Sequence, residues 1–128
     1  QNLINRTKAF NIQERVRFLG FCENPWQWYA GADVFLLSSR WEGMPNAALE
    51  ALACGTKVIA TRESGGVGEI TKELNDTIIV LDENHEFINC MNKVIPTNKK
   101  FISRSLLPNK YKSNNIINTI EGWLNESK

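Results

Sequence analysis

Apolar and polar positions alternate along the chain in blocks that favour an α/β fold. Short apolar runs bounded by glycine, proline or polar residues predict strands. They cover residues 16–20, 33–38, 57–61 and 77–81. Segments with helical spacing lie between them, over residues 26–31, 45–54 and 66–72. Because strands that alternate with helices form βαβ units, the pattern predicts a parallel sheet with helices on both faces.

The two ends of the chain also show helical spacing. Residues 1–11 predict a helix at the start, and residues 83–94 predict an amphipathic helix that Pro96 ends. A further short helix is expected over residues 99–107, and Ser113 is expected to cap a final helix. That last helix carries an apolar stripe, which we expect to pack on the core. The stripe consists of Ile116, Ile117, Ile120, Trp123 and Leu124.

The most informative stretch joins the predicted strand 33–38 to the helix after it. It reads Glu42-Gly43-Met44-Pro45-Asn46-Ala47-Ala48-Leu49-Glu50. Pro45 suits the first helical position, where its missing N–H costs nothing. The backbone N–H groups just after it, near Asn46 to Ala48, would be free to bind an anion with the help of the helix dipole. Gly43 would let a ligand approach the backbone. The stretch therefore predicts a phosphate site.

Two carboxylates eight residues apart frame this stretch. Glu42 lies in the loop, and Glu50 lies one turn after Asn46 on the same helix face. A carboxylate beside a phosphate needs a separate explanation, because like charges repel. One such explanation is a sugar, since a carboxylate can accept two strong hydrogen bonds from a vicinal diol.

This stretch, Glu-x7-Glu followed by Ala-x-Ala-x-Gly-x-x-Val, resembles the donor-binding motif of family-four retaining glycosyltransferases of the GT-B fold. The match runs from Glu42 through Glu50 to Thr61 and continues in Gly65-Gly66-Val67-Gly68-Glu69-Ile70. It also reaches back to Gly20 and to the run from Asp33 to Ser39. The resemblance covers about residues 12–82 closely, and four elements in the right order make it specific.

The resemblance implies a role for each residue of the motif. Glu50 would bind the ribose hydroxyls of a nucleotide sugar. Glu42 would contact the donor sugar near its anomeric carbon and stabilise developing positive charge. The backbone of the intervening residues would hold the sugar and the diphosphate; these are Gly43, Met44, Pro45, Asn46 and Ala47. Each feature also has a plain structural explanation: an exposed helix acid in an ion pair for Glu50, and a turn residue for Glu42.

Two other loops border the implied site. Gly20 and Phe21 follow the first predicted strand, where the family holds the nucleotide base, although a strand-ending glycine and a core phenylalanine explain them equally well. Gly65 and Gly66 would border the donor. Glu69 has a structural explanation, because an acid in the first turn of a helix favours the helix dipole.

The resemblance also implies that residues 1–128 are a partial C-terminal nucleotide-sugar-binding domain. The sequence begins where the family has the second helix of its Rossmann-like domain, so two strands and the N-terminal acceptor domain would be absent. In the strand order 3-2-1-4-5-6, the two absent strands would lie in the sheet between the strands of residues 16–20 and 33–38. We therefore expect an exposed sheet edge, with re-pairing or dimerisation of the isolated chain. We also expect the isolated chain to be inactive, because the family's diphosphate-clamping Arg and Lys precede residue 1.

Composition narrows the possible partners. A net charge of +1 gives no field that would attract nucleic acid, and no apolar run approaches membrane-spanning length.

The cysteines are odd in number and widely spaced, which argues for reduced thiols in the cytosol rather than a zinc site or disulfides. They are Cys22, Cys54 and Cys90. Without an Asp-x-Asp pair, we expect no metal and no cofactor besides the nucleotide-sugar donor. The single histidine, His85, is assigned no role.

By resemblance, the complete enzyme would transfer a hexose or N-acetylhexosamine from a UDP-sugar to a lipid-diphosphate-linked sugar. Such enzymes build O-antigen or capsule at the cytoplasmic, inner face of the bacterial inner membrane, so peripheral membrane association is expected. Two alternatives remain open. One is a UDP-sugar epimerase of the same fold, which needs no acceptor. The other is a non-catalytic sugar-nucleotide-binding module.

Overall fold

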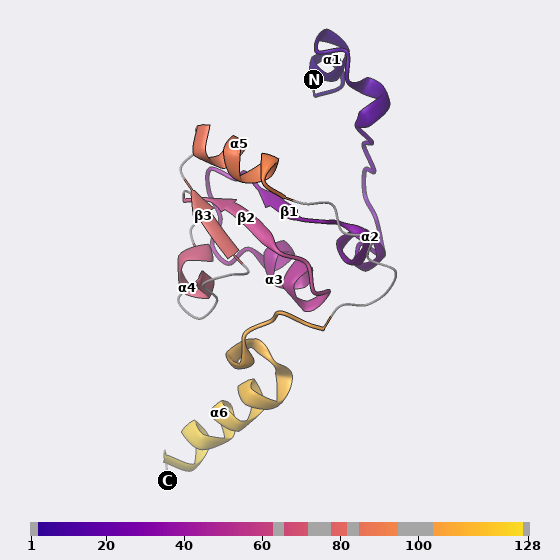
Figure 1. Ribbon diagram of the computed structural model, residues 1–128. Coiled ribbons are helices and arrows are strands. Elements are labelled where there is room, and N and C mark those ends of the chain that lie inside the picture. Colours follow the sequence, from indigo (N-terminus) through magenta and orange to yellow (C-terminus); the bar gives the residue numbers. More distant parts are fainter. Residues whose placement is uncertain (1–2, 63–65, 72–77, 82–84, 95–103, 127–128) are drawn as a thin grey trace.

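The computed structural model describes residues 3–62, 66–71, 78–81, 85–94 and 104–126 (Figure 1). A three-stranded sheet with surrounding helices forms its centre, and α1 and α6 extend away from it at the two ends. The helices and strands are α1 (Leu3–Ala9), η1 (Gln13–Arg15), α2 (Trp26–Gly31), β1 (Phe35–Leu37), α3 (Asn46–Ala53), β2 (Val58–Thr61), α4 (Val67–Thr71), β3 (Ile78–Leu81), α5 (His85–Asn92), η2 (Asn109–Tyr111) and α6 (Ser113–Glu126).

The sheet is parallel, with the strands in the order β1-β2-β3. Leu36 of β1 pairs with Ile59 of β2, which in turn pairs with Ile79 of β3. Helices α3 and α4 cover one face of the sheet and α5 covers the other (Figure 1). The predicted α/β fold, a Rossmann-like parallel sheet with helices on both faces, is therefore confirmed.

The main core lies between the sheet and α3. Alternate strand residues point to this side, including Leu37 of β1 and Val58 and Ala60 of β2. The facing residues of α3 are Ala48, Ala51 and Leu52, all fully buried. Two of them are alanines, so the helix backbone lies close to the strands. Burying one side chain the size of Leu52 contributes about 1.5–3 kcal/mol.

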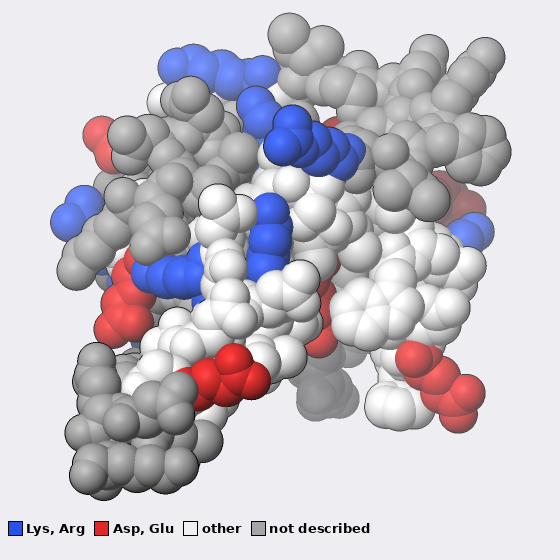
Figure 2. Space-filling model, turned by 90° about the horizontal axis from the view of Figure 1, so that it is seen from below, with Lys and Arg blue, Asp and Glu red and all other residues white. Residues whose placement is uncertain are grey.

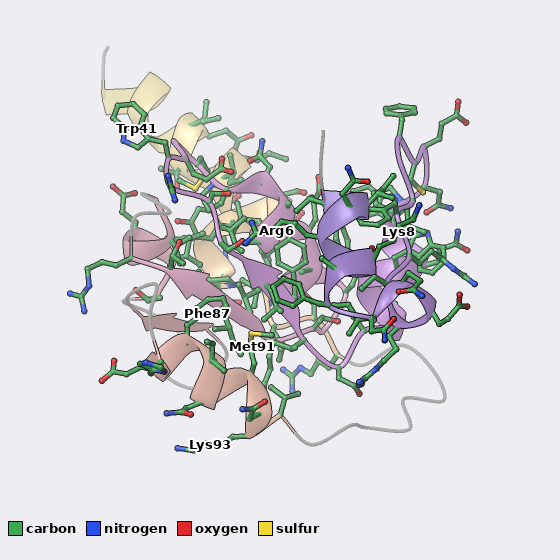
Figure 3. All side chains as sticks on the ribbon, turned by 90° about the horizontal axis from the view of Figure 1, so that it is seen from above. Arg6, Lys8, Trp41, Phe87, Met91 and Lys93 are labelled. Atoms are coloured by element: carbon green, nitrogen blue, oxygen red, sulfur yellow. The ribbon has the colours of Figure 1, made fainter. Side chains whose placement is uncertain are left out.

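The opposite face of the sheet has a smaller cover. Ile59 points to this side, and Phe87 and Met91 lie on the side of α5 that faces the sheet (Figure 3). Ile59 and Phe87 are buried, but Leu36, the neighbour of Ile59 in the register, remains partly exposed. The sheet is thus covered over β2 and less completely over β1.

Helix α3 ends in a Schellman motif. Gly55 has φ +77°, and its N–H donates to the Leu52 carbonyl over 2.9 Å. The Thr56 N–H donates to the Ala51 carbonyl over 2.9 Å. The same Leu52 carbonyl also accepts from the N–H of Leu106 at 2.8 Å, which holds the segment before η2 against the end of α3.

The predicted strand over residues 16–20 is wrong. Within the described part of the chain no strand pairs with this segment, and Val16, Phe18 and Leu19 are exposed. An apolar pattern becomes a strand only when a neighbouring backbone accepts its hydrogen bonds, and β1 bonds to β2 alone. Whether the free edge of β1 leads to re-pairing or dimerisation stays a prediction.

The short helix predicted over residues 99–107 is also wrong where the structure describes it. Residues 104–107 are irregular, and residues 99–103 lie outside the described residues, as does Pro96. Pro108 explains the outcome, because the residue before a proline is driven away from helical geometry. The 3-10 turn η2 that follows Pro108 had no counterpart in the prediction.

The predicted final helix is confirmed as α6, but Ser113 is its first residue rather than its cap. The expected packing of its apolar stripe on the core is wrong for the residues that can be judged. Ile116 is 44% exposed, Ile117 52% and Ile120 47%, because α6 projects from the sheet and contacts mainly η2 (Figure 1). The side chains of Trp123 and Leu124 lie outside the described residues.

Candidate functional site

Two loops meet at the carboxyl ends of β1 and β2. The loop of residues 38–45 leaves β1, and Gly66 follows β2 after residues 63–65, which lie outside the description and include Gly65. The N–H of Gly66 donates to the carbonyl of Gly43 over 2.9 Å. In open parallel sheets the crevice outside the carboxyl ends of the strands is where ligands bind. The contact therefore places the motif stretch in the position expected for a binding loop.

Gly66 has no room for a side chain. A Cβ atom built on it would overlap the carbonyl oxygen of Gly43, and it would lie 3.4 Å from the Met44 Cα, in van der Waals contact. A Cβ on Gly43 itself would meet nothing within 4 Å. The sequence indicated a glycine-rich loop here, and the structure gives the physical reason for one of its glycines.

Pro45 shapes the start of α3 differently from the prediction. It precedes the helix, with φ −79° and ψ 81°, and the Asn46 N–H donates to the Met44 carbonyl over 2.9 Å. This is an inverse γ-turn. Pro45 is therefore not the first helical residue, because its own geometry lies outside the helical region.

Fewer backbone N–H groups are free at the start of α3 than the sequence predicted. Asn46 N–H is taken by Met44, and Ala48 N–H donates to the Pro45 carbonyl over 2.9 Å. Of the three amides that were expected to be free, only that of Ala47 has no hydrogen bond within the described part of the chain. The expected anion site at this helix start is thus smaller than the sequence indicated, and it centres on Ala47.

Glu42 is exposed and held by a serine in its own loop. The Ser39 hydroxyl donates to Oε1 of Glu42 over 2.8 Å. The Ser39 carbonyl in turn accepts from the Thr61 hydroxyl, also at 2.8 Å, at the end of β2. Neither Ser39 nor Thr61 was singled out from the sequence, because hydroxyl groups at a strand end are too common to signal a role.

Glu50 lies on the opposite side of the motif stretch, where α3 packs on α2. Burial raises the pKa of the Tyr29 hydroxyl, and the charge of Glu50 and a hydrogen bond to its side chain raise it further. Burial also raises the pKa of the Cys54 thiol, again with a contribution from Glu50. Glu50 is therefore half-buried beside Tyr29, and its carboxylate keeps some exposure to solvent.

The structure leaves Gly20 and Phe21 apart from these contacts. Gly20 adopts φ +64°, a left-handed geometry that favours glycine, and the Phe21 side chain is 92% exposed. The explanation of Phe21 as a core residue is wrong. The alternative, that this loop holds a nucleotide base, stays a prediction. Trp41, next to Glu42, is also almost fully exposed, and its ring lies at the margin of the molecule (Figure 3).

A groove of about 500 Å³ runs from the motif stretch to α6. Its lining combines apolar side chains with one acid and one lysine: Met44, Glu69, Lys110, Tyr111, Ile116, Thr119 and Ile120. Lys110 Nζ lies 3.4 Å from the Glu69 carbonyl oxygen and 5.0 Å from the Tyr111 ring centroid. The sequence did not reveal this groove, because it depends on the direction in which α6 leaves η2.

Charge and metal-ligating groups add little to the site. On the face seen from below, blue and red side chains are mixed rather than gathered by sign (Figure 2). Among the residues that the structure describes, no three His, Cys, Asp or Glu side chains form a group able to hold a metal ion.

None of the described helices is both long enough and apolar enough to cross a membrane.

The sequence matches one known protein family over most of its length. Residues 1–96 of the 128 match the family described as glycosyl transferases group 1. The chain belongs to the group 1 glycosyl transferases. The matched region contains the whole motif stretch, β1 to β3 and the two loops that meet at Gly43 and Gly66.

Three curated relatives of this glycosyl transferase chain come from Campylobacter jejuni and Escherichia coli. An N-acetylgalactosamine-N,N'-diacetylbacillosaminyl-diphospho-undecaprenol 4-alpha-N-acetylgalactosaminyltransferase of Campylobacter jejuni is 35% identical over 68 residues, 53% of this chain and 19% of the relative. The UDP-Gal:alpha-D-GlcNAc-diphosphoundecaprenol alpha-1,3-galactosyltransferase of Escherichia coli is 32% identical over 90 residues, 70% of this chain and 23% of the relative. An O-antigen biosynthesis glycosyltransferase of Escherichia coli, WclY, is 42% identical over 60 residues, 47% of this chain and 17% of the relative.

The matched segment therefore spans about a fifth of the length of these relatives. No solved structure gives a significant match to the chain.

Proposed function

We propose that this chain is the donor-binding part of a retaining glycosyltransferase that uses a UDP-sugar. The complete enzyme would transfer a hexose or N-acetylhexosamine to a sugar carried on a lipid diphosphate. Residues 1–128 would form part of the C-terminal nucleotide-sugar-binding domain, and another domain would bind the acceptor.

One observation carries the proposal. The stretch from Glu42 to Glu50 runs from the loop at the carboxyl end of β1 into α3, with one carboxylate in the loop and the other on the helix. Glu42 is held by Ser39, Glu50 lies beside Tyr29, and neither carboxylate is buried. Both therefore keep oxygen lone pairs that can accept hydrogen bonds from a sugar.

The proposed roles follow from the positions of these groups. Glu50, beside Tyr29, accepts hydrogen bonds from the ribose diol. Glu42 binds a hydroxyl of the donor sugar and stabilises positive charge that develops at the anomeric carbon. The Ala47 N–H, at the positive end of the α3 dipole, contributes to binding of the diphosphate. The leaving group would then depend on protein side chains and amides, without a metal.

The relatives support the proposed substrates and place of action. One is named for a UDP-galactose donor, and two are named for sugars on diphospho-undecaprenol. A lipid carrier of this kind requires the enzyme to work at a membrane surface. We therefore propose that the complete protein acts in the bacterial cytoplasm, at the inner face of the inner membrane, in O-antigen or related polysaccharide synthesis.

The test is a transfer assay with the complete gene product that contains this chain. UDP-galactose and UDP-N-acetylgalactosamine are offered as donors, with and without a lipid-diphosphate-linked N-acetylhexosamine, and the product linkage is determined by NMR. The proposal predicts acceptor-dependent release of UDP and an α-linked product. Conversion of the UDP-sugar without an acceptor would identify an epimerase instead, and UDP binding without turnover would identify a non-catalytic module.

Variants at the two carboxylates test the proposed roles. Glu42→Gln should lower kcat by at least about tenfold with little change in KM, because the interaction of the Glu42 carboxylate with the donor sugar strengthens in the transition state. Glu50→Gln should mainly weaken donor binding. Glu14→Gln on η1 is the matched control, since it removes one exposed carboxylate away from the sheet. Equal losses in all three variants would contradict the assignment.

A further inference from the structure

The loop that carries Glu42 is anchored on both sides of this residue. On one side, the Thr61 hydroxyl donates to the Ser39 carbonyl at 2.8 Å. On the other side, the Gly66 N–H donates to the Gly43 carbonyl at 2.9 Å. Thr61 ends β2 and is only 2% exposed, so the first anchor belongs to the rigid part of the sheet. The backbone around Glu42 is therefore held by two hydrogen bonds, one from the end of β2 and one from the segment after β2.

The side chain of Glu42 has a separate constraint. The Ser39 hydroxyl donates to Glu42 Oε1 over 2.8 Å, a hydrogen bond to a charged acceptor. An exposed glutamate otherwise samples several rotamers, and a ligand would have to select one of them. The neighbouring Ser38 makes no hydrogen bond through its side chain within the described part of the chain. Of the two serines, Ser39 alone connects the strand end to the carboxylate.

We propose that Ser39 is a positioning residue for Glu42. Thr61, at the rigid end of β2, holds the Ser39 backbone, and the Ser39 hydroxyl in turn holds the carboxylate that faces the donor sugar. The inference rests on the proposed function of Glu42. Ser39 uses one lone-pair site of Oε1, and the remaining sites of the carboxylate stay available for sugar hydroxyls. Ser39 thus acts before the ligand arrives, by holding Glu42 in the orientation that the transition state requires.

The test compares steady-state kinetics of variants of the complete gene product, with UDP-galactose and UDP-N-acetylgalactosamine as the probe donors. Ser39→Ala should lower kcat about tenfold, the cost of about one charge-assisted hydrogen bond, with KM for the donor within about twofold. Ser39→Thr, which keeps the hydroxyl, should recover most of this loss. Ser38→Ala, the matched control, should behave as the parent.

A double-mutant cycle separates positioning from general loop damage. If Ser39 acts through Glu42, Ser39→Ala should cost nothing further once Glu42→Ala is present, so the double variant should match Glu42→Ala alone. Thr61→Val removes the anchoring hydroxyl at nearly constant shape and should lower kcat in the same direction. Unfolding midpoints of all variants are measured alongside the kinetics.

Several results would overturn the inference. These are a Ser39→Ala variant within about twofold of the parent kcat, a loss that persists in the Glu42→Ala background, and a loss that Ser39→Thr does not rescue. Failure of the proposed function would look different. In that case the parent itself would neither bind UDP nor turn over either donor, and the inference would fall with it.

Discussion

Substitution of Gly66 by alanine gives a sharp test of how the two loops meet. The added Cβ would overlap the Gly43 carbonyl oxygen, so the loops must separate or the backbone must bend. Forcing extra atoms into a filled space costs about 1–3 kcal/mol. Separation of the loops would also lose the 2.9 Å hydrogen bond from Gly66 to Gly43, a further loss of about 0.5–1.5 kcal/mol.

A smaller effect works in the other direction. Alanine restricts the unfolded chain and would stabilise the protein by about 0.4–1 kcal/mol at a site that tolerated it. The expected net destabilisation by Gly66→Ala is therefore about 1–4 kcal/mol. Urea unfolding of the 128-residue chain, followed by circular dichroism, should show this as a lower midpoint at an unchanged slope.

Two glycines close to Gly66 serve as controls. A Cβ on Gly68, within α4, meets nothing within 4 Å, so Gly68→Ala should raise the free energy of unfolding by about 0.5–1 kcal/mol. A Cβ on Gly43 also meets nothing within 4 Å, and Gly43→Ala should raise the free energy of unfolding by about 0.4–1 kcal/mol. If Gly66→Ala were as stable as Gly68→Ala, the close approach of the two loops would be refuted.

Three further substitutions test the core, the end of α3 and the surroundings of Glu50. Leu52→Ala should lower the free energy of unfolding by about 2–5 kcal/mol, measured by urea unfolding, while Leu36→Ala on the open face should cost clearly less. Gly55→Ala should cost about 1–2 kcal/mol in the same assay, because residue 55 holds φ +77° at the end of α3. The pKa of Tyr29 is raised in the folded state, so folded protein binds more protons than unfolded protein above about pH 10, and stability should fall as the pH rises through that range. Tyr29→Phe should reduce this alkaline loss, and an unchanged pH profile would contradict the raised pKa of Tyr29.

Local patterns predicted most of the elements around the sheet. Strands β1, β2 and β3 and helices α2, α3 and α5 lie where the apolar runs and helical spacings put them. These elements are short and flanked by glycine, proline or polar residues, and β1, β2, α3 and α5 each bury apolar side chains against a neighbour. For such elements, the sequence pattern and the tertiary packing favour the same structure.

Residues 16–20 and the stripe on α6 show where the same reasoning fails. Both have the apolar pattern of a buried element, yet the apolar residues of 16–20 and the described residues of the stripe, Ile116, Ile117 and Ile120, are exposed in this structure. A pattern specifies which side of an element is apolar, but it does not supply the surface that covers that side. No residue pattern predicts the direction of α6, which sets the shape of the groove beside Met44 (Figure 1).

The candidate site was predictable in its residues and less so in its hydrogen bonds. The two glutamates and the glycine-rich loops followed from the motif. The γ-turn at Pro45, which occupies the Asn46 N–H, depends on backbone angles that no residue type dictates. The partners of the carboxylates, Ser39 and Tyr29, come from three residues before Glu42 and from a different helix, and only the folded structure brings them into contact.

The central claim is that the stretch from Glu42 to Glu50 binds a nucleotide sugar. Calorimetric titration of the complete gene product with UDP, beside its Glu50→Gln and Glu14→Gln variants, tests this claim most directly. The account predicts that the parent and Glu14→Gln bind UDP equally. For Glu50→Gln it predicts a Kd at least about tenfold higher, as the loss of hydrogen bonds to a charged acceptor requires. Absence of UDP binding in the parent, or equal affinity in Glu50→Gln, would contradict it.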